Sequence, residues 1–226
     1  MDPYIDAAKL RPEHPLTAVK LENLRRGDAA HRDRAVVLDA LPVKITLQTT
    51  DQCNLDCPHC QISRADKKPS MSEAVLERVV AELFPTLVEL HPTNLGEPFL
   101  WPHFERLCGE MARYGVLLDL TTNGTLLDQR RIAWILPVVR DVKISFDGAT
   151  AETFERLRRR AKFDDVCRNV RRLSAVTAPG TVALQMTLMR SNASELPALV
   201  TLAAELGVRL VKAYHLFSFR EELDAE

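Results

Sequence analysis

Three cysteines lie within eight residues of one another, at Cys53, Cys57 and Cys60. Thiolates spaced so closely can bind one inorganic cluster, and a cubane of four irons held by three protein ligands leaves one iron available to another molecule. A structural zinc site needs a fourth ligand, and neither a second cysteine pair nor a histidine pair follows in this sequence. The spacing therefore favours an iron–sulfur cluster over zinc.

The order of three intervening residues and then two resembles the CxxxCxxC signature of the radical S-adenosylmethionine (radical SAM) superfamily. This resemblance implies a [4Fe–4S] cluster whose open iron is chelated by the amino and carboxylate groups of S-adenosylmethionine (SAM). It also implies that an electron, supplied by a reductant such as flavodoxin or ferredoxin, cleaves SAM to methionine and a 5′-deoxyadenosyl radical that abstracts hydrogen from a substrate. In such chemistry the protein supplies positioning and electrostatics.

The elements that must position these residues alternate along the chain. Short runs rich in β-branched residues predict strands at residues 43–49, 87–94, 116–121, 141–146, 182–189 and 208–215. Amphipathic stretches predict helices at residues 72–83, 101–113, 128–136, 163–176 and 195–206. This alternation predicts an α/β fold, a partial (βα)6 barrel of parallel strands with outer helices.

Polar motifs follow four of the predicted strands. The cysteine loop follows the first strand, Gly96-Glu97-Pro98 the second and Thr122-Asn123-Gly124 the third, and Ser145 closes the fourth. In parallel α/β folds functional residues gather beyond the carboxyl ends of the strands, so we expect these motifs to meet in one site.

Gly96-Glu97-Pro98 resembles the Gly-Gly-Glu motif of the superfamily, although Asn94-Leu95 stands where a fully glycine-rich version would begin. The resemblance implies that Glu97 and the backbone beside it receive the methionyl ammonium of SAM, and a buried cation does need such an acceptor. The triplet is also typical of an ordinary turn. Thr122 and Asn123 either line the nucleoside pocket or simply end a strand.

The segment from Ser145 to Thr150, continuing to Arg158, resembles one common in the SPASM and Twitch branch of the superfamily. The resemblance implies that Ser145 contacts the SAM carboxylate or ribose and that Arg158 reaches the carboxylate. Asp147-Gly148 is also what a strand-to-helix turn would use. The other basic residues here are expected on a solvated helix face, with at most one member of the run turned inward. They are Arg156, Arg159, Arg160 and Lys162.

His59 stands where the family often has an aromatic residue that meets the adenine, so the resemblance implies a stacking role for it. It could instead point to solvent, or bind zinc. Cys108 and Cys167 fall in predicted helices and are expected to be small buried apolar residues.

Composition restricts the class of protein. The 226 residues, 46% of them hydrophobic, suffice for one sizeable core, and 30 basic against 31 acidic residues imply no affinity for nucleic acid or anionic membranes. No apolar run reaches the length of a membrane span, and the chain does not open with a signal-peptide pattern, so a cytoplasmic protein is expected. A reducing compartment would keep the thiolates available for iron.

Two parts of the chain are predicted. Residues 1–40 form a helical N-terminal extension, whose amphipathic stretch at residues 15–26 and apolar run Val36-Val37-Leu38 are expected to pack against the barrel. Residues 41–226 form the radical SAM core, which ends shortly after the sixth strand. An edge strand needs cover, so a fragment of a longer protein is expected, without the C-terminal domain that carries auxiliary clusters in the SPASM branch.

Three functions remain open. The first is a radical SAM enzyme acting on a peptide, which the SPASM-like segment favours slightly, or on a sugar, nucleoside or amino acid. The second is a noncatalytic zinc or interaction module that uses the same cysteines. The third is a shortened core that binds SAM but does not turn over substrate.

Overall fold

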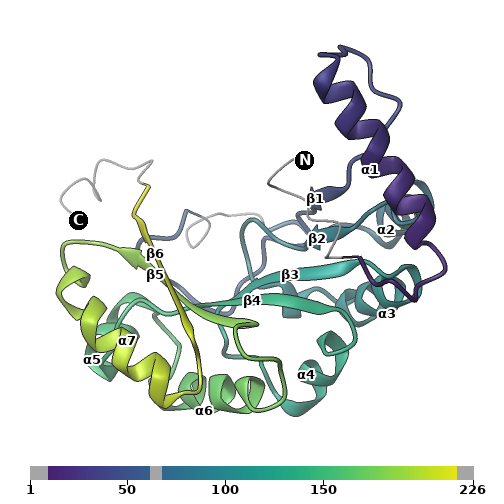
Figure 1. Ribbon diagram of the computed structural model, residues 1–226. Coiled ribbons are helices and arrows are strands. Elements are labelled where there is room, and N and C mark those ends of the chain that lie inside the picture. Colours follow the sequence, from purple (N-terminus) through teal and green to yellow (C-terminus); the bar gives the residue numbers. More distant parts are fainter. Residues whose placement is uncertain (1–9, 62–67, 218–226) are drawn as a thin grey trace.

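A single parallel sheet of six strands forms the centre of the computed structural model, which describes residues 10–61 and 68–217 (Figure 1). The strands lie side by side in chain order and every neighbouring pair is parallel. Their bounds are β1 (Lys44–Thr46), β2 (Glu89–His91), β3 (Leu117–Thr122), β4 (Val139–Ser145), β5 (Val182–Leu188) and β6 (Leu210–His215). The predicted strands and the α/β class are confirmed; the predictions for residues 1–9 and 218–226 fall outside the described residues.

The helices that connect successive strands cover one face of the curved sheet, and one further helix precedes β1 (Figure 1). They are α1 (Thr17–Arg32), α2 (Glu73–Leu83), α3 (Phe104–Tyr114), α4 (Gln129–Ile135), α5 (Ala151–Leu157), α6 (Phe163–Ser174) and α7 (Leu196–Glu205), with 3-10 turns at η2 (Pro98–Leu100) and η3 (Ala193–Glu195). The five helices predicted after the first strand are present. Helix α5, in the connection between β4 and the helix predicted at residues 163–176, was not predicted.

Local signals set two of the helix ends. Ser72 caps α2 by accepting a hydrogen bond from the N–H of Val75 at 3.4 Å, and this satisfies one of the free donors of the first turn. Gly207, with φ +76°, lies just beyond α7, where a left-handed residue reverses the chain.

The two faces of the sheet differ in chemistry. In β3, Leu118 and Leu120 belong to the apolar core, whereas Asp119 between them forms ion pairs with Lys143 of β4 and, at 3.4 Å, with Lys44 of β1. Successive side chains of a strand point to opposite faces, so the helices pack on an apolar face and the inner face is polar and charged. The interior of a closed (βα)8 barrel is instead usually packed with branched apolar side chains.

Helix α1 is anchored at the amino ends of the strands. The Lys20 side chain is buried and donates to the carbonyl oxygen of Leu87 and, at 3.1 Å, to that of Gly115, which precede β2 and β3. Two hydrogen bonds of 2.9 Å join the Asn23 side chain to the backbone of Leu41. The extension is therefore held through polar contacts with the backbone.

The expectation that Val36-Val37-Leu38 packs against the barrel is wrong. These side chains are 98%, 83% and 59% exposed. The reason is that the segment is held by the Asn23–Leu41 backbone contacts, which do not require apolar burial.

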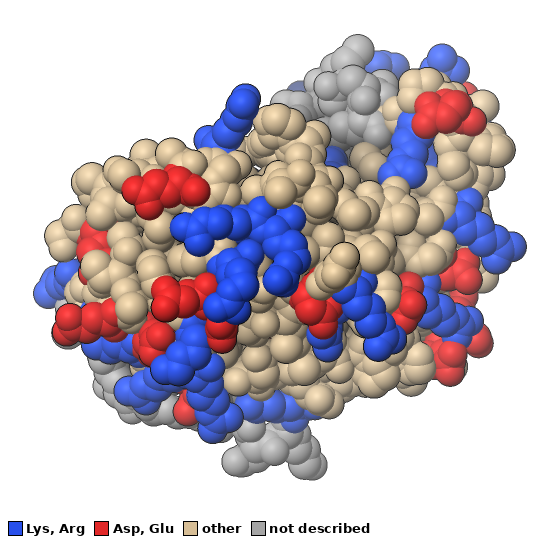
Figure 2. All heavy atoms as spheres, turned by 90° about the horizontal axis from the view of Figure 1, so that it is seen from below, with Lys and Arg blue, Asp and Glu red and all other residues tan. Residues whose placement is uncertain are grey.

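Figure 2 shows basic and acidic side chains interspersed on the face that carries the outer helices. Neighbours of opposite sign pair there, including Arg168 with Asp165 at 2.9 Å and Arg131 with Asp128 at 2.6 Å. Within residues 10–61 and 68–217, no helix combines the length and the apolar character that crossing a membrane requires.

Candidate functional site

A cavity of about 340 Å³ lies at the carboxyl ends of the strands. Its wall includes residues from the loops after β1, β2 and β3 and from the end of β4. Eight of the eleven predicted site residues line it: Cys53, Cys57, Cys60, Gly96, Thr122, Asn123, Ser145 and Arg158. The motifs that the sequence placed after four separate strands therefore meet in one cavity, and three predicted residues, His59, Glu97 and Pro98, lie outside its lining.

The cysteine loop is fixed by its neighbours. Asn54 donates to the Thr125 hydroxyl at 2.8 Å and accepts from Asn123 Nδ2 at 2.9 Å, so the loop is tied to the segment after β3. Asn123 Nδ2 also lies 3.8 Å from Cys53 Sγ, as a donor to sulfur. The N–H of Asp56 donates to the carbonyl of Arg159 at 3.2 Å.

The three thiols share a partly enclosed setting. Burial raises the pKa of Cys57 to about 11 and raises that of Cys53, with smaller contributions to each from Cys60. Thiolates there need a compensating positive charge, and coordination to a metal supplies one, since a coordinating thiol is deprotonated.

The three thiols line the same cavity, and their arrangement bears on which metal group they can hold. Within the described part of the chain, no three His, Cys, Asp or Glu side chains converge closely enough to hold a single ion. A tetrahedral zinc would need such convergence, whereas a cubane takes each thiolate on a separate iron. Three cysteines on one cavity wall fit the cluster.

Gly96 brings the backbone close to the cysteine loop. Its φ is +80°, and a Cβ there would collide with the carbonyl oxygen of Thr50 and lie 2.9 Å from that of Gln52. The next residue donates its N–H to the same Gln52 carbonyl at 2.7 Å. Only glycine satisfies both the left-handed conformation and the close approach.

Glu97 is fully buried behind the cavity wall. Its carboxylate accepts from the Thr122 hydroxyl at 2.8 Å, from the Asn123 N–H at 2.8 Å and from the Phe99 N–H at 3.4 Å. Burial raises its pKa to about 7, and the hydrogen bonds from Asn123 and Thr122 partly oppose that effect. Pro98, also buried, starts the η2 turn.

Gln48 binds the backbone of Asn94-Leu95, the two residues that stand where a fully glycine-rich motif would begin. Its Oε1 accepts from the N–H groups of Asn94 at 2.7 Å and Leu95 at 3.1 Å, while its Nε2 donates to the Leu95 carbonyl at 2.9 Å. The side chain thus holds the loop before Gly96 in place.

Arg158 is the one member of the basic run 156–162 that turns inward, as predicted. Its side chain is 13% exposed, while Arg156, Arg159, Arg160 and Lys162 are exposed. The expectation of a helix face is wrong, because α5 ends at Leu157 and most of the run forms the α5–α6 connection.

His59 lies beside the cavity and does not belong to its lining. Its side chain is 9% exposed, so it does not point to solvent, and it does not line the cavity. Its Nε2 lies 3.2 Å from a carboxylate oxygen of Asp147, which is itself fully buried and 2.6 Å from Nε of Arg158. Asp147 was expected at the end of the fourth strand, where Asp147-Gly148 could equally form a strand-to-helix turn.

Cys108 and Cys167 are buried in helices, as predicted for apolar-like cysteines. Burial raises the pKa of Cys108 to about 12 and that of Cys167 to about 11.

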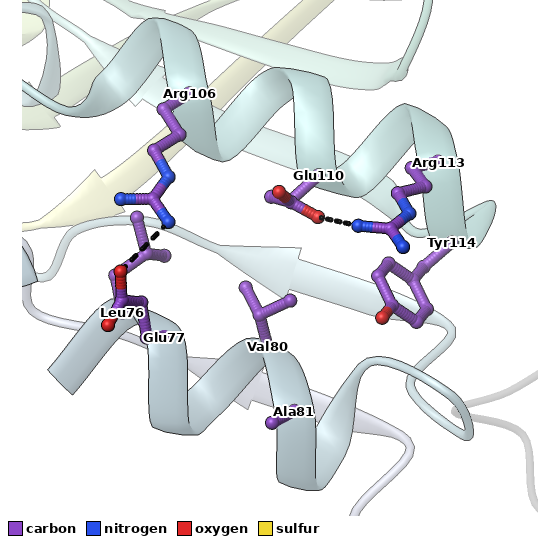
Figure 3. A pocket seen from close by; sticks show the side chains of 8 residues that line it. All are labelled: Leu76, Glu77, Val80, Ala81, Arg106, Glu110, Arg113 and Tyr114. Carbon is purple, nitrogen blue, oxygen red and sulfur yellow. Dashed lines mark hydrogen bonds and ion pairs between the residues drawn. The ribbon is translucent and has the colours of Figure 1, made fainter. Parts of the chain in front are cut away.

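A second, smaller hollow of about 140 Å³ lies between α2 and α3 on the outer surface (Figure 3). Leu76, Val80 and Ala81 contribute its apolar lining, and ion pairs border it, Arg106 with Glu77 at 3.1 Å and Arg113 with Glu110 at 3.5 Å. None of the predicted site residues lies there.

Comparison with protein families gives a match over most of the chain. The model of the Radical SAM superfamily matches residues 47–203. Mycofactocin maturase MftC of Mycobacterium tuberculosis (strain ATCC 25618 / H37Rv) is 32% identical over 176 residues, which cover 76% of this chain and 44% of that protein. GTP 3',8-cyclase of Chlorobaculum tepidum is 31% identical over 175 residues, which cover 74% of this chain and 52% of that protein. The chain thus spans about half the length of these curated relatives.

Solved structures share the fold. Streptococcus suis SuiB bound to precursor peptide SuiA aligns with a TM-score of 0.69 and 13% identity, over 93% of this chain and 47% of that one. Native anSMEcpe with bound AdoMet aligns with a TM-score of 0.67 and 19% identity, over 78% of this chain and 52% of that one. The open parallel sheet with outer helices is therefore an architecture that these proteins have in common with this chain.

Proposed function

Because the chain belongs to the radical SAM superfamily, we propose that it is the core of an enzyme that abstracts hydrogen from a peptide. The cofactors of the family are a [4Fe–4S] cluster and SAM. The observation that carries the proposal is the meeting of Cys53, Cys57 and Cys60 with Gly96, Ser145 and Arg158 around one cavity. When bound and reduced there, the cofactors supply a 5′-deoxyadenosyl radical.

The cysteines hold the cluster in this proposal. They come from a loop that Asn54 and Asn123 tie to the segment after β3. These contacts hold the loop in place, which reduces the ordering that cofactor binding requires. Cys57 is the most buried of the three, and the positive charge of Arg158 lowers its pKa against the effect of burial.

Other residues of the same cavity bind SAM in this proposal. Arg158 and Ser145 face the cavity and offer donors to the carboxylate, and a guanidinium suits a carboxylate because it presents several N–H groups in one plane. Glu97 supplies negative charge behind the wall for the methionyl ammonium and keeps Thr122 and Asn123 in place through its hydrogen bonds. Gly96 admits the close backbone approach, and Thr122 and Asn123 border the nucleoside.

Two relatives support a peptide substrate. One is named a maturase, and the structure of another contains a precursor peptide. The similarity to a GTP cyclase makes a nucleotide the alternative class of substrate. Flavodoxin or ferredoxin in the cytoplasm is the proposed electron donor.

The test uses the chain purified without oxygen and reconstituted with iron and sulfide. After reduction with SAM present, we expect about four irons per chain and release of 5′-deoxyadenosine and methionine. Cys57→Ala should lose both the cluster and the nucleoside, whereas Cys108→Ala, which removes a thiol outside the cavity, should retain both. Stoichiometric zinc with no nucleoside would contradict the proposal and favour a noncatalytic module.

A separate measurement addresses the substrate. Deuterated peptides and deuterated nucleotides are offered in parallel, and deuterium is sought in the released 5′-deoxyadenosine. Transfer from a peptide supports the proposed class, and transfer from a nucleotide alone contradicts it. If SAM binds but no substrate is consumed, a version of the chain extended beyond Glu226 shows whether further residues complete the cavity.

A further inference from the structure

Asp147 is a buried carboxylate that joins three parts of the site. It follows β4, and its side chain has no solvent exposure. One carboxylate oxygen lies 2.6 Å from Nε of Arg158 and 3.2 Å from Nε2 of His59. The other accepts a hydrogen bond from the N–H of Thr187 at 2.8 Å, which fixes the carboxylate to the end of β5.

The partners of Asp147 belong to the two halves of the proposed cofactor site. His59 lies in the cysteine loop, between Cys57 and Cys60. Arg158 lines the cavity, and its positive charge acts on Cys57. A single carboxylate therefore holds both the loop that carries the thiols and the guanidinium that faces them.

The charge on Asp147 is retained in this buried position. Burial by itself would raise the pKa of the carboxyl group, but the positive charge of Arg158, with smaller effects of His59 and of the Thr187 N–H, outweighs it and lowers the pKa to about 2. Arg158 in turn needs this partner, because a buried guanidinium without a counter-charge is strongly unfavourable. Because Nε lies 2.6 Å from Asp147 in an ion pair, the other N–H groups of the guanidinium can serve Cys57 and the cavity.

We propose that Asp147 is a positioning residue, which sets the orientation of Arg158 toward Cys57 and the SAM carboxylate. This inference rests on the proposed function. Asp147 acts through Arg158 and touches neither cofactor, since it does not line the cavity. Its fixed negative charge also offsets the guanidinium beside the cluster. Charge near an iron–sulfur cluster is one determinant of its reduction potential.

A turn residue would behave differently from a positioning residue. The backbone carbonyl of Asp147 accepts from Asn192 Nδ2 at 3.0 Å, and the Asp147→Asn side chain can still accept from Thr187. That variant therefore keeps the turn but loses the charge. A role confined to the turn predicts no change in SAM affinity or in the potential of the cluster.

The experiment compares reconstituted wild type with Asp147→Asn, Arg158→Gln and the double variant. Two readouts are used: SAM affinity by equilibrium dialysis, and cluster midpoint potential by a redox titration followed by EPR. We expect Asp147→Asn to weaken SAM binding about tenfold, the equivalent of one lost charge-assisted contact, and to raise the midpoint potential. In the Arg158→Gln background the same change should have little further effect on affinity, because the two residues act as one unit.

Asp165→Asn is the matched control, because it removes an aspartate paired with an arginine on the exposed surface of α6. It should leave affinity and potential unchanged. Unchanged affinity in Asp147→Asn with an intact cluster, or full additivity in the double variant, would overturn the proposal.

If Asp147→Asn does not retain its cluster, the SAM affinity of Arg158→Lys is measured instead. An ammonium keeps the charge beside Asp147 but lacks the planar fork that serves two partners at once. Weaker SAM binding at unchanged iron content supports the positioning role, and unchanged binding overturns it. A wild type that binds no cluster refutes the proposed function itself, so the two failures are distinguishable.

Discussion

The carboxylate of Glu97 accepts a hydrogen bond of 2.8 Å from the backbone N–H of Asn123, which joins the loop after β2 to the loop after β3. Asn123 passes this constraint on to the cysteine loop through Asn54, 2.9 Å from its amide nitrogen. The polar loops at the carboxyl ends of three strands are therefore one connected unit, and substitutions in one loop should be detected in the others.

Glu97→Gln should weaken SAM binding about tenfold or more while leaving the fold intact. The glutamine oxygen can still accept from Asn123, and the Thr122 hydroxyl can reverse its role and accept from the new amide. Because the pKa of Glu97 is about 7, the carboxylate becomes charged as the pH rises from 6 to 8, so the difference in affinity between wild type and variant should grow over that range. Equilibrium dialysis at several pH values measures it.

Glu195→Gln is the control for that prediction. Glu195 also accepts hydrogen bonds from backbone N–H groups, at 2.6 Å from Ala149 and 3.2 Å from Thr150, but it does not line the cavity. Equal losses of affinity in both variants, or none in Glu97→Gln, would show that the charge of Glu97 has no bearing on SAM.

Gly96→Ala should lower the free energy of unfolding by roughly 2 kcal/mol and abolish SAM binding. An added Cβ would meet the carbonyl oxygens of Thr50 and Gln52, in a backbone conformation that side chains rarely adopt. Gly109→Ala in α3 is the control, because nothing lies within 4 Å of its Cβ position and the helix should gain up to about 1 kcal/mol. Urea denaturation measures the free energy of unfolding of both variants. An unchanged value for Gly96→Ala would contradict the close approach of Gly96 to the carbonyls of Thr50 and Gln52.

Asn123→Ala should lower the midpoint potential of the reconstituted cluster. The variant loses the N–H donor that lies 3.8 Å from Cys53 Sγ, and hydrogen bonds to cluster sulfurs favour the reduced, more negative form. Asn54→Ala removes the neighbouring partner but not the donor to sulfur, so a smaller shift is expected. The two redox titrations should rank the variants in this order; the reverse order would refute the assignment of the donor.

Lys20 should make stability depend on pH in the alkaline range. Burial, with a smaller effect of Arg11, lowers the pKa of Lys20 from 10.5 to about 8, so between these pH values the unfolded chain binds more protons than the folded one. The free energy of unfolding of wild type relative to Lys20→Met should therefore rise from pH 8 to pH 10.5, by an amount on the order of 2 kcal/mol once solvent screening is allowed for.

Lys162→Met, which removes an exposed lysine, should show no comparable trend between pH 8 and pH 10. A flat difference for Lys20→Met would mean that burial does not lower the pKa of Lys20.

The sequence was most informative where the signals are local. Six strands and five helices could be predicted because apolar periodicity is visible in consecutive residues. The proximity of Cys53, Gly96 and Ser145 could be predicted because parallel strands run in the same direction. What could not be predicted depends on contacts across the chain. Gln48 reaches the loop of Asn94, and Asp147 reaches His59, and no spacing within either segment indicates these pairs.

Two expectations failed for identifiable reasons. Val36-Val37-Leu38 is apolar, but Asn23 secures the segment by backbone hydrogen bonds, so its side chains are not buried. The basic run 156–162 has no helical period of its own, because α5 ends before most of it begins. Arg158 could be singled out only as one inward member of the run, and its partner was set by tertiary packing.

The most direct test of the central claim is the EPR spectrum of the reduced, reconstituted chain, recorded with and without SAM. An iron with no protein ligand should bind SAM, so adding SAM should change the g values of a [4Fe–4S]⁺ signal in wild type and in Cys108→Ala. A cubane signal that SAM leaves unaltered, or no cubane signal at all, would contradict the assignment of Cys53, Cys57 and Cys60.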